Sequence, residues 1–506
     1  MQENTMIINT TDSFLKNLSI FCFLIFPASL VAGPFVAELS MNIISIVFLF
    51  NAFKTKNFSF CKKKFFIIFV LFYAYILFSS FFSVYAEDIL HKNFFYFRFV
   101  VFAYAVSHLL LNNKNITLLF YKSLLLTIFL VSADGFVQYL FGTDLIGYTQ
   151  IRPDRVAGLF GDKLILGSYI SRLFPLLVGL FFYNLKFLKF REVLISIIII
   201  IFSLMMVVIS GERMSLATML IYCAAASIFI DFNKKIKIII SSLILAIVSL
   251  LLVLQPNLFK RHYNDTVSQV NFKFEKENFF SNFYYYGEIY NTAFAGFLDQ
   301  KIIGQGPKSF RLFCSDPKFV TNQINNYNVT LEDLLDLKKI RVDKVFVEIN
   351  ESVKKGDILF AYLVDNKSKN YIAKEDFVVI NININKDFVG KSINTREHFI
   401  YYKKYANGCN THPHNFYLQL LSETGIVGFS FIFLIFSYFV YLIIKYFYFS
   451  VVKKKKLLSN LQISLALGFL MTLLPIIPNG NFFNNWLNMI MFLPVGFYIF
   501  SLSKNK

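Results

Sequence analysis

Charged residues are scarce in this chain. Asp, Glu, Lys and Arg make up only 16% of its 506 residues, whereas a soluble globular protein carries roughly a quarter. Hydrophobic residues make up 56% of the sequence. Heptads, low-complexity tracts and internal repeats do not stand out either. This composition excludes an ordinary soluble domain and directs attention to the apolar runs.

The apolar runs are long enough to cross a membrane. Stretches of about 20 residues recur from Phe14 onward, and a hydrocarbon core of about 30 Å requires that length. The first run is too long for a signal peptide and lacks a small-residue cleavage site, so we expect it to be retained. We predict an all-α polytopic membrane protein with about twelve transmembrane helices. The spans are expected near residues 14–34, 36–53, 64–85, 93–111, 116–140, 164–184, 191–210, 214–232, 236–255, 420–446, 457–477 and 482–502.

The basic residues report orientation. The formal net charge is +19, but the lysines gather in alternate short loops instead of forming one basic surface. Lys and Arg are enriched in cytoplasmic loops of membrane proteins, so this pattern predicts cytoplasmic N- and C-termini. Membrane lipids are therefore expected partners, and nucleic acid is not. The loops contain Lys54, Lys56, Lys62–Lys64, Lys186, Lys189, Arg191, Lys234, Lys235, Lys237, Lys453–Lys456, Lys504 and Lys506.

One long loop falls on the opposite side. Residues 256–415 separate an N-terminal membrane domain (1–255, about nine spans) from a C-terminal membrane domain (416–506, about three spans). Within the loop, residues from about 340 to 399 alternate between apolar and polar, as in "VVINININ" from Val378 to Asn385. Period-two alternation predicts strands, so a small β-rich insert is expected here.

Two of the five cysteines, Cys314 and Cys409, lie in this outer loop. A disulfide persists in an oxidising compartment, which makes the pair a disulfide candidate. Sequence does not define the geometry that a bond requires, so the pairing is left open.

Polar residues gather where the long outer loop ends and re-enters the membrane, in "THPHNFYLQLLSETGIVGF" (residues 411–429). Pro413 is tolerated in the first turn of a helix, so we expect a helix to begin there. Asn415, Gln419, Ser422 and Glu423 then share one stripe, which should face protein or water. His414 would lie at the helix N-terminus, where the helix dipole opposes protonation and leaves a neutral ring able to act as a general base.

Three arginines are expected at the same face: Arg155, Arg213 and Arg311. The planar guanidinium binds phosphate oxygens in a bidentate manner, so arginines beside a neutral histidine favour a lipid-linked phosphate or pyrophosphate. Each arginine also has a simpler interpretation, because Arg213 can snorkel to the interface and Arg155 can be a solvated loop residue. Metal binding by His412 and His414 is disfavoured, since no cysteine or carboxylate cluster with ligand spacing accompanies them.

Four segments resemble a known family. "HPHNFYLQLLSETGIVGF" is similar to the signature of the O-antigen ligase and O-antigen polymerase superfamily, which are bacterial inner-membrane glycosyltransferases. "RVAGLFGDKLILGSY", "SGERMSLA" and "IIGQGPKSF" resemble three further family segments, in the family's order. The resemblance covers roughly residues 130 to 430. The histidine segment is fairly specific, whereas the glycine turn alone is weak.

The resemblance implies a C-type glycosyltransferase that uses neither a nucleotide sugar nor a metal or other cofactor. Its donor would be a glycan on undecaprenyl pyrophosphate at the periplasmic face, and its acceptor lipid A-core or another glycan. Carried over, His414 is the base, next to Asn415, while Arg155 and Arg213 hold pyrophosphate. Glu423 would have a structural role, and His412 and Arg311 are possible supporting residues. The β-rich insert is longer than the family's usual loop, which leaves the acceptor open.

Other functions stay open at this stage. A repeat-unit polymerase is the alternative within the family. A transporter of lipid-linked glycans is the alternative from another class, but it should carry polar groups near mid-bilayer and paired broken helices. A scaffold that binds partners through the β-rich insert leaves Arg155 and Arg213 without a role.

Overall fold

The computed structural model describes residues 2–503 except residues 114, 270–278, 284–285, 317, 320–326, 329–339, 349–350, 365–366, 374–376, 383–391, 394–399, 404–408 and 476. Most of the described chain is helical. The helices are α1 Gln2–Ala32, α2 Pro34–Thr55, α3 Lys64–Phe81, α4 Ala86–Phe94, α5 Arg98–Asn112, α6 Ile116–Phe141, α7 Leu166–Asn184, α8 Phe190–Ile209, α9 Arg213–Phe229, α10 Lys234–Leu254, α11 Pro256–Phe259, α12 Asp265–Val267, α13 Gly287–Asp299, α14 Phe310–Phe313, α15 Phe416–Val451, α16 Asn460–Thr472 and α17 Asn485–Ser503.

Ten helical segments of the described chain are long and apolar enough to cross a membrane. They coincide with ten of the predicted spans, which confirms a multi-pass membrane protein. At the two other predicted positions, near 214–232 and 457–477, the structure has the shorter apolar helices α9 and α16. The predicted number of about twelve crossings is therefore not confirmed and stays a prediction.

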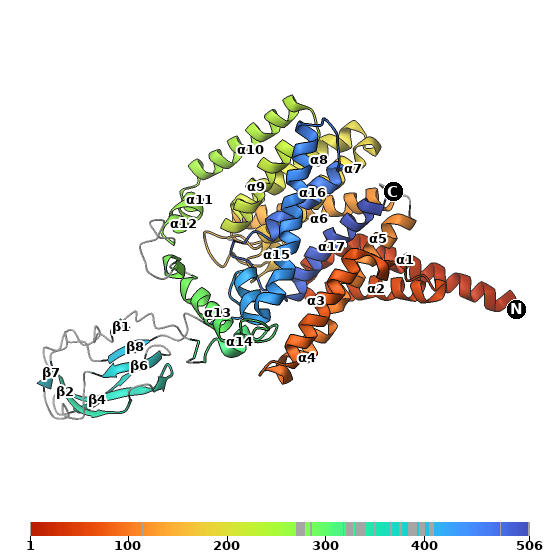
Figure 1. Cartoon of the computed structure of the whole chain (residues 1–506). Helices are drawn as coiled ribbons and strands as arrows, with labels where there is room; N and C mark the ends of the chain where they lie inside the picture. Colours follow the sequence, from red (N-terminus) through yellow and green to blue (C-terminus); the bar gives the residue numbers. More distant parts are fainter. Residues whose placement is uncertain are drawn as a thin grey trace.

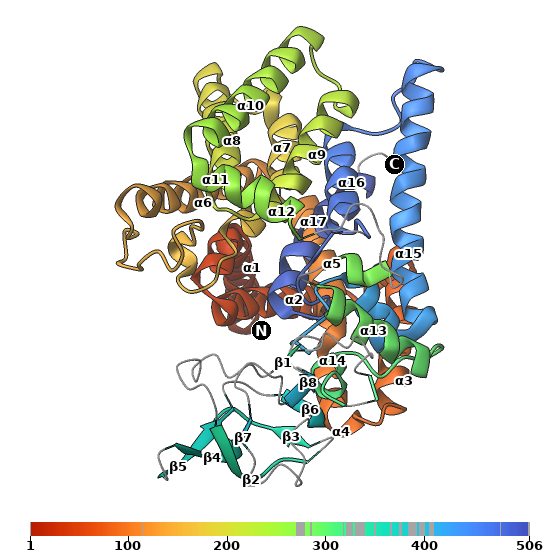
Figure 2. The same ribbon diagram turned by 90° about the vertical axis from the view of Figure 1, so that its left-hand side faces the viewer.

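The long helices form one bundle (Figure 1). In this bundle α1 lies along α2, α5 lies along α17, and α7 packs between α6 and α16. The buried core is rich in aromatic side chains, and the Phe23 ring stacks on the rings of Phe120 and Phe497. The helix α15 runs along one side of the bundle (Figure 2). Large apolar side chains stay exposed on the long helices, as expected where lipid replaces water.

A β-rich region lies beyond one end of the bundle (Figure 1). Its strands form two four-stranded antiparallel sheets with the orders β1-β8-β6-β3 and β5-β4-β2-β7. Strands β2 to β7 fall within the predicted insert, and β1 and β8 flank it. Parts of that insert, residues 383–391 and 394–399 among them, lie outside the described residues. The strands are β1 Tyr327–Asn328, β2 Ile340–Val345, β3 Ser352–Val353, β4 Ile358–Val364, β5 Lys367–Ile372, β6 Phe377–Ile382, β7 Ser392–Ile393 and β8 Ile400–Lys403.

Candidate functional site

A cavity of about 1210 Å3 lies at the end of the bundle where α7, α9 and α17 begin and α15 follows the histidine segment. Its lining brings together residues from loops far apart in sequence, and several of them carry charge or a titratable ring. Of the residues singled out in the sequence, Arg155, Arg311, His412 and His414 line this cavity, whereas Arg213, Asn415, Glu423, Cys314 and Cys409 do not.

The two histidines precede α15. The prediction that the helix begins at Pro413 is wrong, because Asn415 is the N-cap and Phe416 is the first helical residue. The Asn415 side-chain oxygen accepts hydrogen bonds from the backbone N–H groups of Tyr417 and Leu418, at 3.0 and 3.1 Å. This is how an asparagine cap satisfies the free amides of a first turn. His414 has a left-handed backbone with φ of 57°, which does not continue a helix.

Both histidine rings are partly buried and in contact. Their centroids lie 4.1 Å apart, and the centroid of the Tyr286 ring lies 5.4 Å from that of His414. Burial lowers the pKa of His414 below its usual 6.5. Burial, the adjacent His414 ring and Arg311 lower the pKa of His412 to about 4, although the Asn479 backbone acts in the opposite direction. Both rings are therefore mainly neutral near pH 7, and burial is the largest cause.

The predicted polar stripe of α15 faces protein. Asn415, Gln419, Ser422 and Glu423 are all buried. The Glu423 carboxylate accepts hydrogen bonds from the backbone N–H of Lys308 (2.9 Å), the backbone N–H of Phe310 (3.0 Å) and the Gln419 amide (3.0 Å). A buried carboxylate requires such partners. Glu423 therefore fixes the segment 302–310 against α15 and does not face the cavity.

A break in α15 makes room for that segment. Gly425 has φ of 61° and ψ of −169° inside the helix. The backbone N–H groups of Gln305 and Gly306 donate to the carbonyls of Ser422 and Glu423, at 2.9 and 2.8 Å. A Cβ atom on Gly304 would lie 2.4 Å from the Glu423 carbonyl carbon, so only glycine allows this approach. The segment that is bonded to α15 in this way leads into α14, which carries Arg311.

A disulfide joins the end of this segment to the histidines. Cys314 and Cys409 are bonded, with their Cα atoms 4.9 Å apart. Cys314 is buried in a small cluster that includes Phe310, Phe313 and the side chain of Tyr286. Since Cys409 lies three residues before His412, the bond ties α14 and the histidine segment to the same cluster.

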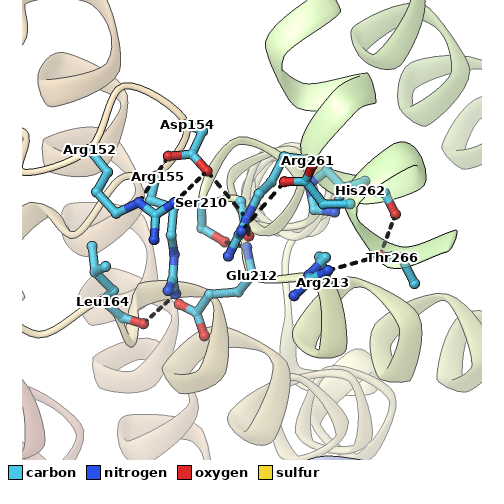
Figure 3. Close-up of polar contacts among 12 residues, drawn as sticks. Arg152, Asp154, Arg155, Leu164, Ser210, Glu212, Arg213, Arg261, His262 and Thr266 are labelled. Atoms are coloured by element: carbon cyan, nitrogen blue, oxygen red, sulfur yellow. Dashed lines mark hydrogen bonds and ion pairs between the residues drawn. The ribbon is translucent and has the colours of Figure 1, made fainter. Parts of the chain in front are cut away.

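Arg155 reaches the cavity from the loop between α6 and α7. Gln138 of α6 holds that loop, because its side-chain oxygen accepts from the backbone N–H groups of Ala157 and Gly158 at 2.9 and 2.8 Å. Arg155 Nη2 donates to the Leu164 carbonyl at 2.8 Å (Figure 3). Its Nε is buried and makes no hydrogen bond to the described residues. Burial lowers the pKa of Arg155, and the nearby Glu212 carboxylate opposes this effect.

Two charged residues that the sequence did not single out complete this wall. Arg172, on the second turn of α7, lines the cavity and donates from Nε to Ser168 Oγ and from Nη2 to Asn479 Oδ1, both at 3.1 Å. Glu212 also lines the cavity and caps α7, because its carboxylate accepts from the backbone N–H groups of Gly167 (2.8 Å) and Ser168 (3.1 Å). Burial raises the pKa of Glu212 to about 7, against the charge of Arg155.

The Arg213 side chain points away from the cavity. Its guanidinium donates to Gln269 Oε1 at 2.8 Å. It also donates to Thr266 Oγ1 at 3.4 Å, in the segment that follows α11 (Figure 3). The structure therefore does not bring Arg213 to the wall that holds Arg155. Adjacent residues at a helix start project in different directions, so Glu212 faces α7 while Arg213 faces α12.

The sequence carried a signal for Arg172 but none for Asn479. Arg172 is a charge inside the predicted span 164–184, and intramembrane charges usually mark a site. Asn479 lies in a loop whose role depends on contacts with residues far away in sequence. Within the described residues, no group of three or more His, Cys, Asp and Glu side chains is placed to hold a metal ion. No family model and no curated protein matches this chain.

Proposed function

We propose that this protein is a membrane glycosyltransferase of the O-antigen ligase type. It transfers a glycan from an undecaprenyl-pyrophosphate carrier to a hydroxyl acceptor such as lipid A-core. The reaction takes place at the periplasmic face of a bacterial inner membrane, with residues 256–415 on that side and both termini in the cytoplasm. The β-rich region would then stand in the periplasm, near the cavity end of the bundle.

The observation that carries the proposal is the set of side chains that line one cavity. Guanidinium groups from Arg155, Arg172 and Arg311 line the same space as two neutral imidazoles. Arginines suit a pyrophosphate because each fork contacts two oxygens. A neutral imidazole suits proton abstraction from a hydroxyl, because its free nitrogen accepts the proton. A site for glycan transfer from a phosphorylated lipid requires both groups.

The reaction needs one proton transfer and one displacement. The acceptor hydroxyl gives its proton to His414 as its oxygen bonds to the anomeric carbon of the donor sugar. The bond from that carbon to the phosphate oxygen breaks, and carrier pyrophosphate leaves with the bonding electrons. The arginines stabilise the charge that develops on the leaving oxygen. His414 then releases its proton to water, and the enzyme is restored.

Two alternatives differ from this proposal by their products. A repeat-unit polymerase performs the same chemistry with a second carrier-linked glycan as acceptor. A transporter moves the intact carrier-linked glycan and breaks no bond. The charged groups of the cavity gather near one end of the helices, whereas transport sites lie near the membrane midplane, which favours an enzyme.

The test uses the purified full chain in liposomes that contain a carrier-linked glycan. We expect glycosylated acceptor and free carrier pyrophosphate to appear in equal amounts when lipid A-core is supplied, with a chelator present and no nucleotide sugar. Products only with a second carrier-linked glycan would identify a polymerase. Movement of intact donor across the bilayer without products would identify a transporter and refute the proposal.

A further inference from the structure

The loop between α16 and α17 passes beside the histidine segment, and one residue of it contacts both sides of the cavity. The backbone N–H of Asn479 donates to the His414 carbonyl at 2.7 Å. The Asn479 side-chain Oδ1 accepts from Arg172 Nη2 at 3.1 Å. Asn479 itself lines the cavity. A single residue therefore links an arginine of α7 to the backbone of the histidine.

His414 needs such a link because of its backbone. A residue with a side chain rarely adopts the left-handed conformation that His414 has, with φ of 57°. Such a conformation persists only where neighbouring groups hold it, and it is frequent at functional sites. The hydrogen bond from Asn479 to the His414 carbonyl, together with the Asn415 cap on the next residue, fixes the peptide groups after His414.

Arg172 in turn is fixed on α7. Its Nε donates to Ser168 Oγ, and the backbone N–H of Ser168 donates to Glu212. Nη1 of Arg172 makes no hydrogen bond within the described part of the chain, so it is available to a ligand in the cavity that the residue lines. The contacts run without a break from the start of α7, through Arg172 and Asn479, to His414.

We propose that Asn479 is a positioning residue that holds the His414 ring at a fixed place relative to the Arg172 guanidinium. The inference rests on the proposed function, in which Arg172 binds the donor pyrophosphate and His414 takes the acceptor proton. Asn479 contacts the Arg172 guanidinium and the His414 backbone, and it takes no part itself in the bonds that form and break. It acts by keeping the base and the anion site in register.

Other hydrogen bonds also hold the loop between α16 and α17 in place. A change of the Asn479 side chain therefore tests its link to Arg172 without releasing the loop. Asn415 Nδ2 donates to the Pro475 carbonyl at 2.7 Å. Gln419 donates to Asn481 Oδ1 and accepts from the Phe482 backbone N–H, both at 2.9 Å. These contacts remain when the Asn479 side chain is removed. Asn479→Ala should therefore fold and insert normally while the link to Arg172 is lost.

Two variants change the Asn479 side chain that Arg172 contacts and keep the backbone N–H that donates to the His414 carbonyl. Asn479→Ala removes the acceptor for Arg172, so kcat should fall about 10²-fold, the scale of a misplacement of about 1 Å, with little change in the donor KM. Asn479→Asp keeps an acceptor for Arg172 but adds a negative charge beside the anion site. It should retain more of kcat than Asn479→Ala and raise the donor KM. Asn112→Ala, at the far end of α5, is the matched control with unchanged kinetics, because among the described residues the Asn112 side chain bonds only to His108.

A second readout does not depend on turnover. Diethyl pyrocarbonate reacts with neutral imidazoles, and mass spectrometry of the peptide gives the rate at His414. That rate should rise several-fold in Asn479→Ala and stay unchanged in Asn112→Ala. Wild-type kcat and an unchanged His414 rate in folded Asn479→Ala would overturn the proposal. If the wild type transfers no glycan, the proposed function fails, and the labelling rate alone decides whether Asn479 positions His414.

Discussion

The two polar segments at the cavity differ in how well their sequence predicts where side chains point. In the histidine segment, Gln419 and Glu423 lie one helical turn apart, and both are buried on the inner side of α15. In the turn between α8 and α9, the neighbours Glu212 and Arg213 diverge, one to α7 and the other to Gln269. Within a long helix the 3.6-residue period fixes direction, whereas at a helix start the packing partners decide it.

This difference changes which arginines belong with the histidines. The family resemblance pairs Arg155 with Arg213 as the residues that would hold pyrophosphate. The structure pairs Arg155 with Arg172 and Glu212 on one cavity wall. Arg213 instead fixes the segment around α12 to the start of α9. Mutants of the two segments can test whether this grouping has functional meaning.

The largest effect is expected in the histidine segment. His414→Ala should reduce glycan transfer by about 10²–10⁴, the usual contribution of a general base. His412→Ala should cause a smaller loss, because His412 shapes the turn or contacts the acceptor without taking its proton. Neither change touches the Asn415 cap, so α15 should form in both variants.

The measurement is transfer from a carrier-linked glycan to a supplied acceptor, at matched amounts of folded protein and with chelator present. Full activity in His414→Ala would refute its role as the base. A greater loss in His412→Ala would exchange the roles of the two rings, and loss of wild-type activity on chelation would favour a metal.

A smaller effect should distinguish Arg172, which lines the cavity, from Arg213, which does not. Lysine keeps the charge but loses the two-pronged contact with phosphate oxygens. Arg172→Lys should lower kcat/KM for the donor about 10- to 100-fold, the range expected for one charged hydrogen bond. Arg213→Lys should have a clearly smaller effect, because its guanidinium does not line the cavity. Arg191→Lys, at the opposite end of α8, serves as the control for the substitution itself.

Donor kinetics at saturating acceptor distinguish the two groupings. A loss in Arg213→Lys equal to that in Arg172→Lys would restore the pairing that the sequence suggested. It would also mean that the α12 segment moves when donor binds.

Much of the fold follows from the sequence, and less of the site does. Runs of about 20 apolar residues predict the long helices, because length and apolarity alone meet the requirement of a membrane span. The strict alternation from Val378 onward likewise predicts a strand, and β6 is found there. The sequence predicts the start of α15 too early, at Pro413, because proline is compatible with a first turn. The helix begins at Phe416, after the Asn415 cap.

The features of the site that the sequence does not predict depend on contacts between residues far apart in the chain. Asn479 is joined to Arg172 across more than 300 positions in the chain, and local patterns contain no information about such a pair. The break at Gly425 depends in the same way on the approach of Gly304 from another loop. By contrast, the side of α15 that carries Glu423 could be predicted, because it follows from the helical period alone.

The smallest expected effect is the dependence of turnover on pH. It distinguishes titration of the two histidines from titration of Glu212. His414 acts as a base only when it is unprotonated, and its pKa is lowered by burial below the usual 6.5. The midpoint of the acid-side fall in turnover that His414 limits should therefore lie below pH 6.5, outside the range from pH 8 to 6.5. The pKa of His412, about 4, places its protonation further below this range. Glu212, with a pKa raised to about 7, is the group that would add an inflection within the range.

Glu212→Gln isolates the contribution of the histidine, because the amide cannot titrate. The kcat profile of this variant should have no midpoint between pH 8 and 6.5, whatever its absolute value, and should fall with a midpoint at more acidic pH. A wild-type inflection near pH 7 that disappears in Glu212→Gln would assign it to the carboxylate that caps α7. A midpoint above pH 6.5 that persists in Glu212→Gln would mean that the pKa of His414 is not lowered as the proposed chemistry requires.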